Sequence, residues 1–167
     1  GMTELSGTSV TCMGNVNKFT SLGIPLPLNT YGIFERGTDK ELKYGEEGEI
    51  CITGPTEMLG YLDNEEEECK VIKIHSDGKK WIHSEDVGII DEDGFLFFKG
   101  RYKRLIPHGG FKLYPSYIEG VIMKHPDIDN CCVISIPDKV YGASPEAHVV
   151  IKKDSVSELK KLKETSK

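Results

Sequence analysis

The stretch that decides the fold runs from Trp81 to Glu119 and reads WIHSEDVGIIDEDGFLFFKGRYKRLIPHGGFKLYPSYIE. An isolated acid, Asp86, precedes an acidic turn and an aromatic segment, and a basic run then begins at Arg101. The glycine pair Gly109-Gly110 comes before a segment with helical character. A carboxylate that accepts hydrogen bonds from a ribose diol, with a cation nearby, is one way to hold a nucleotide. On spacing alone, a charged hairpin followed by a helix is the favoured interpretation.

Four blocks of sequence add a resemblance to these observations. Gly1-Met2-Thr3-Glu4 resembles the end of a YGMTE motif, and residues 48–61 resemble a GEI…GP..M.GY block. Residues 81–101 resemble W.HTGD.G..DEDG…GR, and residues 109–119 resemble GGF..YP..IE. These motifs, in this order, are those of the adenylate-forming superfamily, which includes acyl- and aryl-CoA synthetases, peptide-synthetase adenylation domains and luciferases. The order of four blocks makes the resemblance specific.

The resemblance implies an α+β fold in two parts. Residues 1–100 would form the distal, mostly β part of the large adenylating domain. Residues 101–167 would form most of the small C-terminal lid domain, which ends before the motif that carries the catalytic lysine. The composition also changes at Gly100-Arg101, which favours a boundary there.

The activity implied is that of an AMP-forming acid–thiol ligase, most simply an acyl-CoA synthetase. ATP would activate a carboxylic acid as an acyl-adenylate, and coenzyme A would then displace AMP. The expected cofactors are ATP/AMP, Mg²⁺ and coenzyme A, and the expected partner is the N-terminal portion of the enzyme. Two alternatives remain: an adenylation domain that loads an amino or hydroxy acid onto a carrier protein, and a non-catalytic binding module or product of a broken gene.

Four residues match nucleotide-site positions of the family. By resemblance, Thr3 would hydrogen-bond the AMP phosphate, and Glu4 would help to hold magnesium. Asp86 would accept hydrogen bonds from the ribose hydroxyls, and Arg101 would also contact the ribose. The simpler interpretations are a polar turn for Thr3 and Glu4 and a strand-end cap for Asp86. If the nucleotide interpretation is right, the Asp86 and Arg101 side chains should lie on the same side of the molecule, facing the cleft between the two parts.

Three further residues match family positions that serve the domain rotation or coenzyme A. Lys103 would be the hinge about which the small domain rotates between the two half-reactions. Gly109 and Gly110 would form a turn that the coenzyme A arm approaches. A solvated lysine and an ordinary hairpin glycine pair are the simpler interpretations of these positions.

The chain departs from the family pattern in ways that bear on activity. Ser84-Glu85-Asp86 stands where the family has TGD, so Glu85 could strain a backbone that needs a positive φ. Residues 22–32 resemble the family's VG.PLPG segment, but Leu28 stands where that segment has glycine. Pro107 stands where many members have lysine. Neither the TSGTTG.PK phosphate loop nor the PKT..GK motif with the catalytic lysine occurs in the 167 residues. We therefore expect no catalytic residue here, and an inactive isolated chain.

Composition excludes some classes of function. A net charge of −6 argues against nucleic acid or an anionic membrane as the main partner. The sequence has no long apolar run and no secretory leader. The five cysteines form no CxxC pair, and the histidines lie away from them in the sequence. This spacing argues against zinc and disulfides, and it predicts reduced, mostly packing thiols in a cytoplasmic protein.

Sequence patterns also predict local structure. Alternation over residues 49–53 predicts a half-buried strand, and the acidic run 63–68 predicts a solvated helix start. Residues 76–78 and 91–94 read as hairpin turns, and residues 105–113 as a short hairpin. Other expectations are a capping box of Ser116 with Glu119, a helical face of Ile118, Val121 and Ile122, buried strands at 131–136 and 148–151, and a helix that starts at Ser155 with Glu158.

Overall fold

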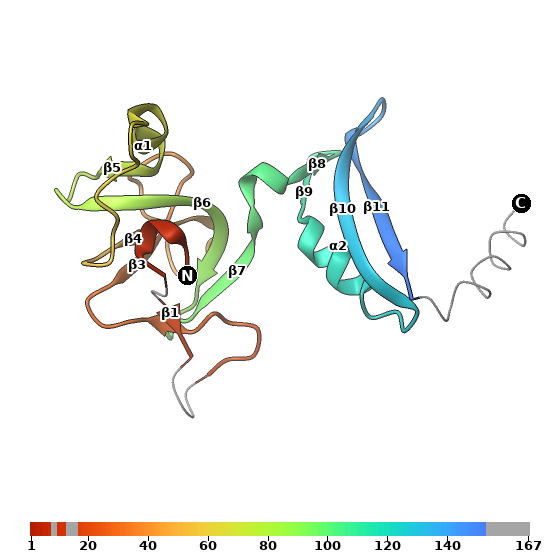
Figure 1. Ribbon diagram of the computed structural model, residues 1–167, viewed down its shortest axis with the longest axis horizontal. Coiled ribbons are helices and arrows are strands. Elements are labelled where there is room, and N and C mark those ends of the chain that lie inside the picture. The colour runs from red at the N-terminus through yellow and green to blue at the C-terminus, as the bar shows by residue number, and fades with distance from the viewer. Residues whose placement is uncertain (8–9, 13–16, 153–167) are drawn as a thin grey trace, which may run out of the picture. The chain divides into compact units, whose positions relative to one another are not determined.

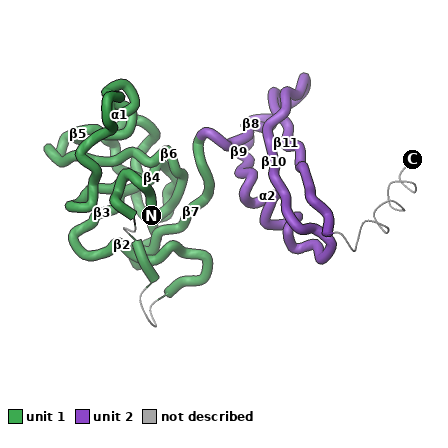
Figure 2. Tube along the Cα trace, viewed as in Figure 1, with its two compact units in different colours: residues 1–102 green, residues 103–167 purple. Residues whose placement is uncertain are grey.

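A computed structural model describes residues 1–7, 10–12 and 17–152 of the chain (Figure 1). The chain divides into two compact units, Gly1–Tyr102 and Lys103–Lys167, which Figure 2 colours separately. The sequence interpretation placed the boundary two residues earlier, after Gly100. Strands dominate both units and helices are few, so the predicted α+β class is confirmed.

Unit 1 is built on a five-stranded antiparallel sheet in which one long strand, β6, pairs with β4, β5 and β7. Strand β3 pairs with β4 at one edge, and the short strands β1 and β2 form a separate ribbon. The elements of this unit are η1 (Thr3–Leu5), β1 (Val10–Thr11), β2 (Ile24–Pro25), β3 (Thr30–Phe34), β4 (Gly48–Thr53), α1 (Glu65–Val71), β5 (Ile72–Ile74), β6 (Lys80–Ile90) and β7 (Leu96–Arg101).

Tight turns set the β5–β6 and β6–β7 pairings, as the sequence predicted. Gly94 has a φ of +83°, and the Asp91 carboxylate accepts hydrogen bonds from the backbone N–H groups of Asp93 (3.1 Å) and Phe95 (2.9 Å). Gly78 closes the β5–β6 turn with a φ of +77°. Glycine reaches these left-handed conformations without a steric penalty. The acidic residues of the 91–94 turn therefore close a hairpin.

Strand β4 is buried on both faces, so the prediction of a half-buried strand was wrong. Ile50 and Ile52 pack into the main core with Ile33, Ile82 and Leu96. Glu49 and Cys51 point to the opposite face and are only 3% and 0% exposed. Aromatic rings from β3 and from the β5–β6 hairpin cover this second face, and the alternation pattern of one strand cannot reveal such a cover.

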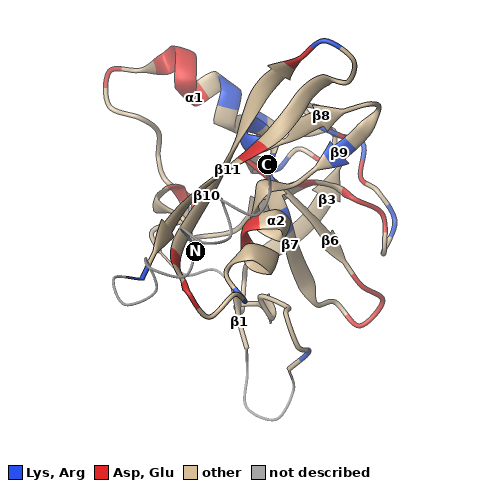
Figure 3. Ribbon diagram, turned by 90° about the vertical axis from the view of Figure 1, so that its right-hand side faces the viewer, with Lys and Arg blue, Asp and Glu red and all other residues tan. Residues whose placement is uncertain are grey.

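The acidic segment before β5 forms helix α1, confirming the predicted solvated helix start. The Asn64 side chain accepts a hydrogen bond from the backbone N–H of Glu67 (3.3 Å) and caps the N-terminus. No residue of this helix is buried, and its acidic first turn stands out in Figure 3. Four glutamates near the positive end of the helix dipole are favourably placed.

Unit 2 combines one helix with a four-stranded antiparallel sheet in the order β10-β11-β8-β9. Gly109 and Gly110 have φ values of +56° and +87° and join β8 to β9, which confirms the predicted hairpin. The elements are η2 (Tyr102–Arg104, which begins at the last residue of unit 1), β8 (Ile106–His108), β9 (Phe111–Leu113), α2 (Pro115–Ile122), β10 (Ile128–Asp138) and β11 (Gly142–Ile151).

Helix α2 does not begin with the predicted capping box. Its N-cap is Tyr114, which makes no side-chain cap, and Pro115 supplies the first turn with a preset φ. Glu119 accepts hydrogen bonds from the backbone N–H of Val133 (2.9 Å) and from Arg104 (2.6 Å) instead of capping the helix. Val121, predicted on the apolar face, is 66% exposed.

Strands β10 and β11 confirm the predicted strands but not their burial, because Val133 is the fully buried side chain among their described residues. The expected helix from Ser155 lies outside the described residues. All five cysteines are free, but Cys51 alone is buried, so the packing interpretation holds for that residue only. Within the described ranges, no helix combines the length and apolar character that crossing a membrane requires.

Both departures from family glycines fall at left-handed positions, with φ of +57° at Glu85 and +71° at Leu28. A side chain costs about 1–2 kcal/mol there, whereas glycine adds about 0.5–1 kcal/mol of unfolded-chain entropy. We therefore expect Glu85→Gly to raise the free energy of unfolding by about 0.5–1 kcal/mol in urea denaturation.

The matched control is Glu92→Gly, at an exposed turn residue whose φ is not positive. The free energy of unfolding of that variant should fall by about 0.5–1 kcal/mol, because its unfolded chain gains entropy and no backbone strain is relieved in the folded chain. Equal losses in the two variants would contradict a strained backbone at Glu85.

Candidate functional site

The candidate site is built around a bulge in β6. In the pairing of β4 with β6, Glu49 faces Val87 and Cys51 faces His83. Three residues, Ser84 to Asp86, therefore lie opposite the single residue Ile50. A bulge of this kind bends a strand and redirects its side chains, and the left-handed backbone of Glu85 lies at its centre.

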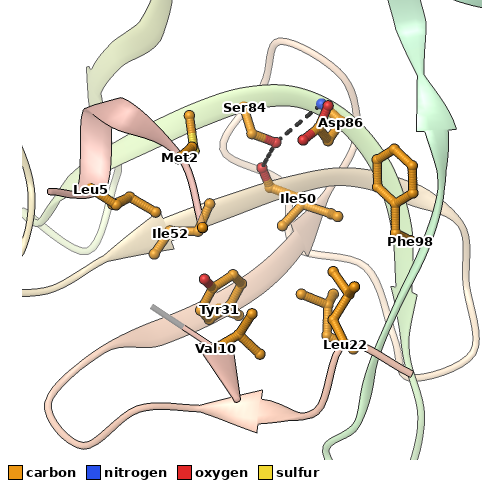
Figure 4. A pocket seen from close by; sticks show the side chains of 12 residues that line it. Met2, Leu5, Val10, Leu22, Tyr31, Ile50, Ile52, Ser84, Asp86 and Phe98 are labelled. Atoms are coloured by element: carbon orange, nitrogen blue, oxygen red, sulfur yellow. Dashed lines mark hydrogen bonds between the residues drawn. The ribbon is translucent and has the colours of Figure 1, made fainter. Parts of the chain in front are cut away.

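Hydrogen bonds to the buried strand β4 hold the bulge in place. The Glu49 carboxylate accepts a hydrogen bond from the backbone N–H of Glu85 (3.1 Å). The Ser84 hydroxyl donates to the carbonyl of Ile50 (2.7 Å) and accepts from the backbone N–H of Asp86 (3.0 Å), as Figure 4 shows. These bonds fix the backbone on both sides of Asp86, so its side chain has a defined direction.

The side chains of Asp86 and Arg101 lie on the same side of unit 1, which agrees with that part of the nucleotide interpretation. The two residues face each other across β6 and β7, and Arg101 Nε lies 2.8 Å from Asp86 Oδ1. This contact lacks hydrogen-bond geometry, so the buried Oδ1 atom has no hydrogen-bond donor among the described residues. Burial raises the pKa of Asp86 above its ordinary value, and the charge of Arg101 opposes that shift.

A small cavity of about 60 Å³ opens beside Asp86 (Figure 4). The N-terminal turn contributes Gly1, Met2 and Leu5 to its wall, and β6 contributes Ser84 and Asp86. The rest of the lining is apolar apart from the Tyr31 hydroxyl. A carboxylate oxygen without a donor, next to an apolar cavity, is a place where a ligand hydroxyl would form a hydrogen bond that the protein does not supply.

The predicted residues Thr3 and Glu4 lie in the turn η1, which the buried side chain of Leu5 anchors. Glu4 Oε1 accepts a hydrogen bond from the Tyr61 hydroxyl (2.7 Å), and burial together with this bond raises the pKa of Tyr61 to about 12. The charge of Glu4 contributes to the raised pKa of Asp86. Unit 1 therefore brings Glu4 and Asp86 into electrostatic contact, while Thr3 is exposed at the surface.

The remaining predicted residues belong to unit 2. Lys103 is its first residue and is exposed. A Cβ atom at Gly110 would meet nothing within 4 Å, whereas one at Gly109 would lie 3.1 Å from the Tyr141 ring. Gly110 therefore leaves open space over the turn, and Gly109 packs against the unit itself. Lys103, Gly109 and Gly110 belong to unit 2, whereas Asp86 and Arg101 belong to unit 1.

Two family models match the chain: AMP-binding enzyme over residues 1–62, and AMP-binding enzyme C-terminal domain over residues 117–166. The structure superposes on o-succinylbenzoate CoA synthetase (MenE) from Bacillus subtilis, solved with the acyl-adenylate OSB-AMP, with a TM-score of 0.83 and 30% identity. That match covers 100% of this chain and 34% of the synthetase. The chain belongs to the adenylate-forming enzyme family.

Curated members of the adenylate-forming family give the same result. The chain is 38% identical to a probable 4-coumarate–CoA ligase 1 of Dictyostelium discoideum over 92% of its length. It is also 38% identical to the putative acyl–CoA ligase YdaB of Bacillus subtilis over 90% of its length. The chain spans 27% and 29% of the lengths of these two relatives. A further MenE structure, 32% identical to this chain with a TM-score of 0.81, contains ATP and a magnesium ion.

Sequence reasoning missed two supporting residues in this adenylate-forming chain: Glu49, which holds the bulge of Asp86, and Tyr61, which holds Glu4. Glu49 reads as a strand residue on the solvent face, and Tyr61 reads as a loop aromatic. The available signal for Glu49 is its place within GEI, directly before a buried Ile-Cys-Ile run. A carboxylate inside an otherwise apolar strand needs a buried partner, and that requirement could have identified it.

Because burial raises its pKa, Asp86 binds a proton more tightly in the folded chain than in the unfolded chain. Ionisation of Asp86 therefore lowers the free energy of unfolding as the pH rises through the pKa of the folded chain. This loss is absent below the pKa that Asp86 has in the unfolded chain. An asparagine side chain at this position would not titrate, and the exposed Arg101 partner contributes at most about 1 kcal/mol. We expect the stability of Asp86→Asn relative to wild type to increase from about pH 3.5 to 7.

Urea denaturation of both proteins at several pH values measures this difference. Asp77→Asn is the control, because hydrogen bonds from the backbone of Lys79 lower the pKa of Asp77, which gives the opposite trend. An Asp86→Asn variant that loses stability relative to wild type as the pH rises would show that the charge stabilises the fold.

Proposed function

We propose that this chain supplies the ribose-binding residues and the small C-terminal domain of an AMP-forming acid–CoA ligase of the acyl-CoA synthetase type. The observation that carries the proposal is the buried Oδ1 of Asp86, which accepts no hydrogen bond from the described residues although Arg101 lies beside it. The two hydroxyls of a ribose donate hydrogen bonds of the kind that this atom lacks. Relatives named as CoA ligases support coenzyme A as the acceptor.

In the proposed reaction, a carboxylate oxygen attacks the α-phosphorus of ATP. The new acyl–phosphate bond forms as the bond to pyrophosphate breaks. The sulfur of coenzyme A then attacks the acyl carbonyl carbon, and AMP departs with the electron pair of the broken bond. The protein does little covalent chemistry in such a reaction, and its contribution is to position charges and reactants.

The residues of unit 1 would act on the nucleotide. Asp86 would accept from the ribose hydroxyls, and Arg101 would keep that carboxylate ionised and contact the same sugar. Thr3 would donate to the AMP phosphate. Glu4 would supply a carboxylate oxygen, the type of ligand that Mg²⁺ prefers. The Tyr61 hydroxyl supports this role, since it fixes the direction of the Glu4 side chain.

The residues of unit 2 would serve the second half-reaction. We propose that residues 1–100 belong to the large adenylating domain, that residues 101–167 belong to the lid, and that Lys103 is the hinge. The division of the chain after Tyr102 and the separate family matches on either side support this assignment. The open space over Gly110 is compatible with the approach of the coenzyme A arm.

A titration with AMP tests the ribose site directly. In amide NMR spectra of the 167-residue chain, millimolar AMP should shift the resonances of residues 84–87 and Arg101. The 2′,3′-dideoxy analogue of AMP should shift them less, because it lacks both hydroxyls. Asp86→Asn should abolish the difference between the two nucleotides.

The matched control is Asp91→Asn, in the turn after the same strand β6, which should preserve the preference for AMP. Equal shifts with AMP and its dideoxy analogue in the wild-type chain would remove the ribose role from Asp86. Shifts confined to other residues would do the same.

A second prediction concerns activity. Neither the phosphate-loop motif nor the catalytic-lysine motif occurs in the 167 residues, and each such charge-stabilising element is worth about 10²–10³ in rate. We expect this chain alone to catalyse no acid-dependent exchange of labelled pyrophosphate into ATP. The assay would use a panel of aryl and alkyl carboxylic acids, with intact MenE as the positive control. Exchange that depends on one acid would contradict the expectation.

A further inference from the structure

A cluster of metal-binding side chains lies in unit 1 on the face of the sheet opposite the main core. Glu49 and Cys51 alternate on β4 and therefore point to the same face. His83 lies on β6 directly opposite Cys51. These three side chains are 3%, 0% and 2% exposed. They offer a carboxylate, a thiol and an imidazole, which are the three types of ligand that zinc takes from proteins.

The ligand atoms converge on a single point. Cys51 Sγ lies 3.4 Å from His83 Nδ1, and Glu49 Oε2 lies 3.0 Å from the same nitrogen. All three atoms lie within 4.8 Å of one another. A tetrahedral zinc ion with bonds of about 2.3 Å to sulfur and about 2.0 Å to nitrogen and oxygen sets its ligands about 3.3–3.6 Å apart. The sulfur–nitrogen and oxygen–nitrogen separations fit this geometry with shifts of a few tenths of an ångström.

The surrounding residues orient these ligands as metal sites require. His83 Nε2 lies 2.9 Å from Nε2 of His75, which stacks on Trp81 with ring centroids 5.3 Å apart. A histidine that binds a metal through one nitrogen normally donates the other N–H to a fixed acceptor. Glu49 is held in the same way by the backbone N–H groups of Gly37 and Glu85, each 3.1 Å from a carboxylate oxygen.

The charge of the cluster also points to a cation. The His83 imidazole lies 3.0 Å from the Glu49 carboxylate and forms an ion pair with it only when it is protonated. A buried carboxylate is costly unless a cation or donors compensate it. A divalent ion bound by one carboxylate, one thiolate and one neutral imidazole has no net charge, so it can be buried at little electrostatic cost.

We propose that Glu49, Cys51 and His83 bind one zinc ion, with His75 as the residue that positions His83. Binding replaces the thiol proton with a zinc–sulfur bond and releases that proton to solvent. The neutral imidazole would bind through Nδ1 and keep its one proton on Nε2, from which it would donate a hydrogen bond to His75. Since Glu49 also holds the backbone of Glu85, the ion fixes the bulge that carries Asp86. Neither the three zinc ligands nor His75 is among the residues that would bind the nucleotide.

Cobalt substitution tests the site, because thiolate-to-cobalt charge transfer in the near ultraviolet identifies sulfur ligation, and tetrahedral cobalt absorbs strongly in the visible. The probe protein keeps Cys51 and has serine at the other four cysteines, which are exposed or half-buried. We expect both bands to saturate at one Co²⁺ per chain and to disappear when one equivalent of Zn²⁺ is added. His83→Gln and Glu49→Gln should each weaken binding at least about 10-fold.

The second measurement uses two single variants of the chain that otherwise keep all of its cysteines, Cys51→Ser and Cys69→Ser. Cys69 is an exposed cysteine of α1. The Cys51→Ser variant should lose the charge-transfer band, and Cys69→Ser should keep it. A folded wild-type chain that shows no such band at stoichiometric Co²⁺ overturns the proposal. A band that survives Cys51→Ser, or that needs the exposed cysteines, overturns it as well.

Discussion

The Glu49 carboxylate is the interaction on which the rest of unit 1 depends. It is almost fully buried and accepts hydrogen bonds from the backbone of Gly37, beyond strand β3, and of Glu85, in the bulge of β6. Its contact with His83 adds a third tie. One side chain on β4 thereby connects both neighbouring strands, and it does so beside the residue that carries the proposed ribose contact.

Asp86 has the opposite character. Its charge is partly buried, its nearest cation is misaligned for hydrogen bonding, and one oxygen has no donor among the described residues. A group in this state contributes little to folding, which agrees with the ligand contact proposed for it. The bonds from Glu49 and Ser84 provide the rigidity that Asp86 does not provide for itself. Glu49 and Ser84 therefore stabilise the bulge, whereas Asp86 is the side chain that would bind a ligand.

Much of this architecture could be predicted from the sequence, and the failures share one cause. Hairpins at Gly78, Gly94 and Gly109-Gly110 follow from glycine turns and were correct, as was the strained position of Glu85. Those features depend on residues close together in the chain. The burial of Glu49, the exposure of Val121 and the true partners of Glu119 depend on strands that pack from elsewhere. The proposed zinc site has the same character, since Cys51 and His83 are neighbours only through strand pairing, which their spacing in the sequence does not express.

The β4–β6 pairing has a further consequence for how unit 1 folds. Strands β5, β6 and β7 form consecutive hairpins with short turns, and their closure costs little chain entropy. Strand β4 must instead find β6 across a separation of 32 residues between Cys51 and His83. Non-local pairings of this kind form late and slow the folding of β proteins. The Asp86 bulge is shaped by this pairing, so it would be among the last parts of unit 1 to reach its final geometry and the first to lose it when the sheet opens.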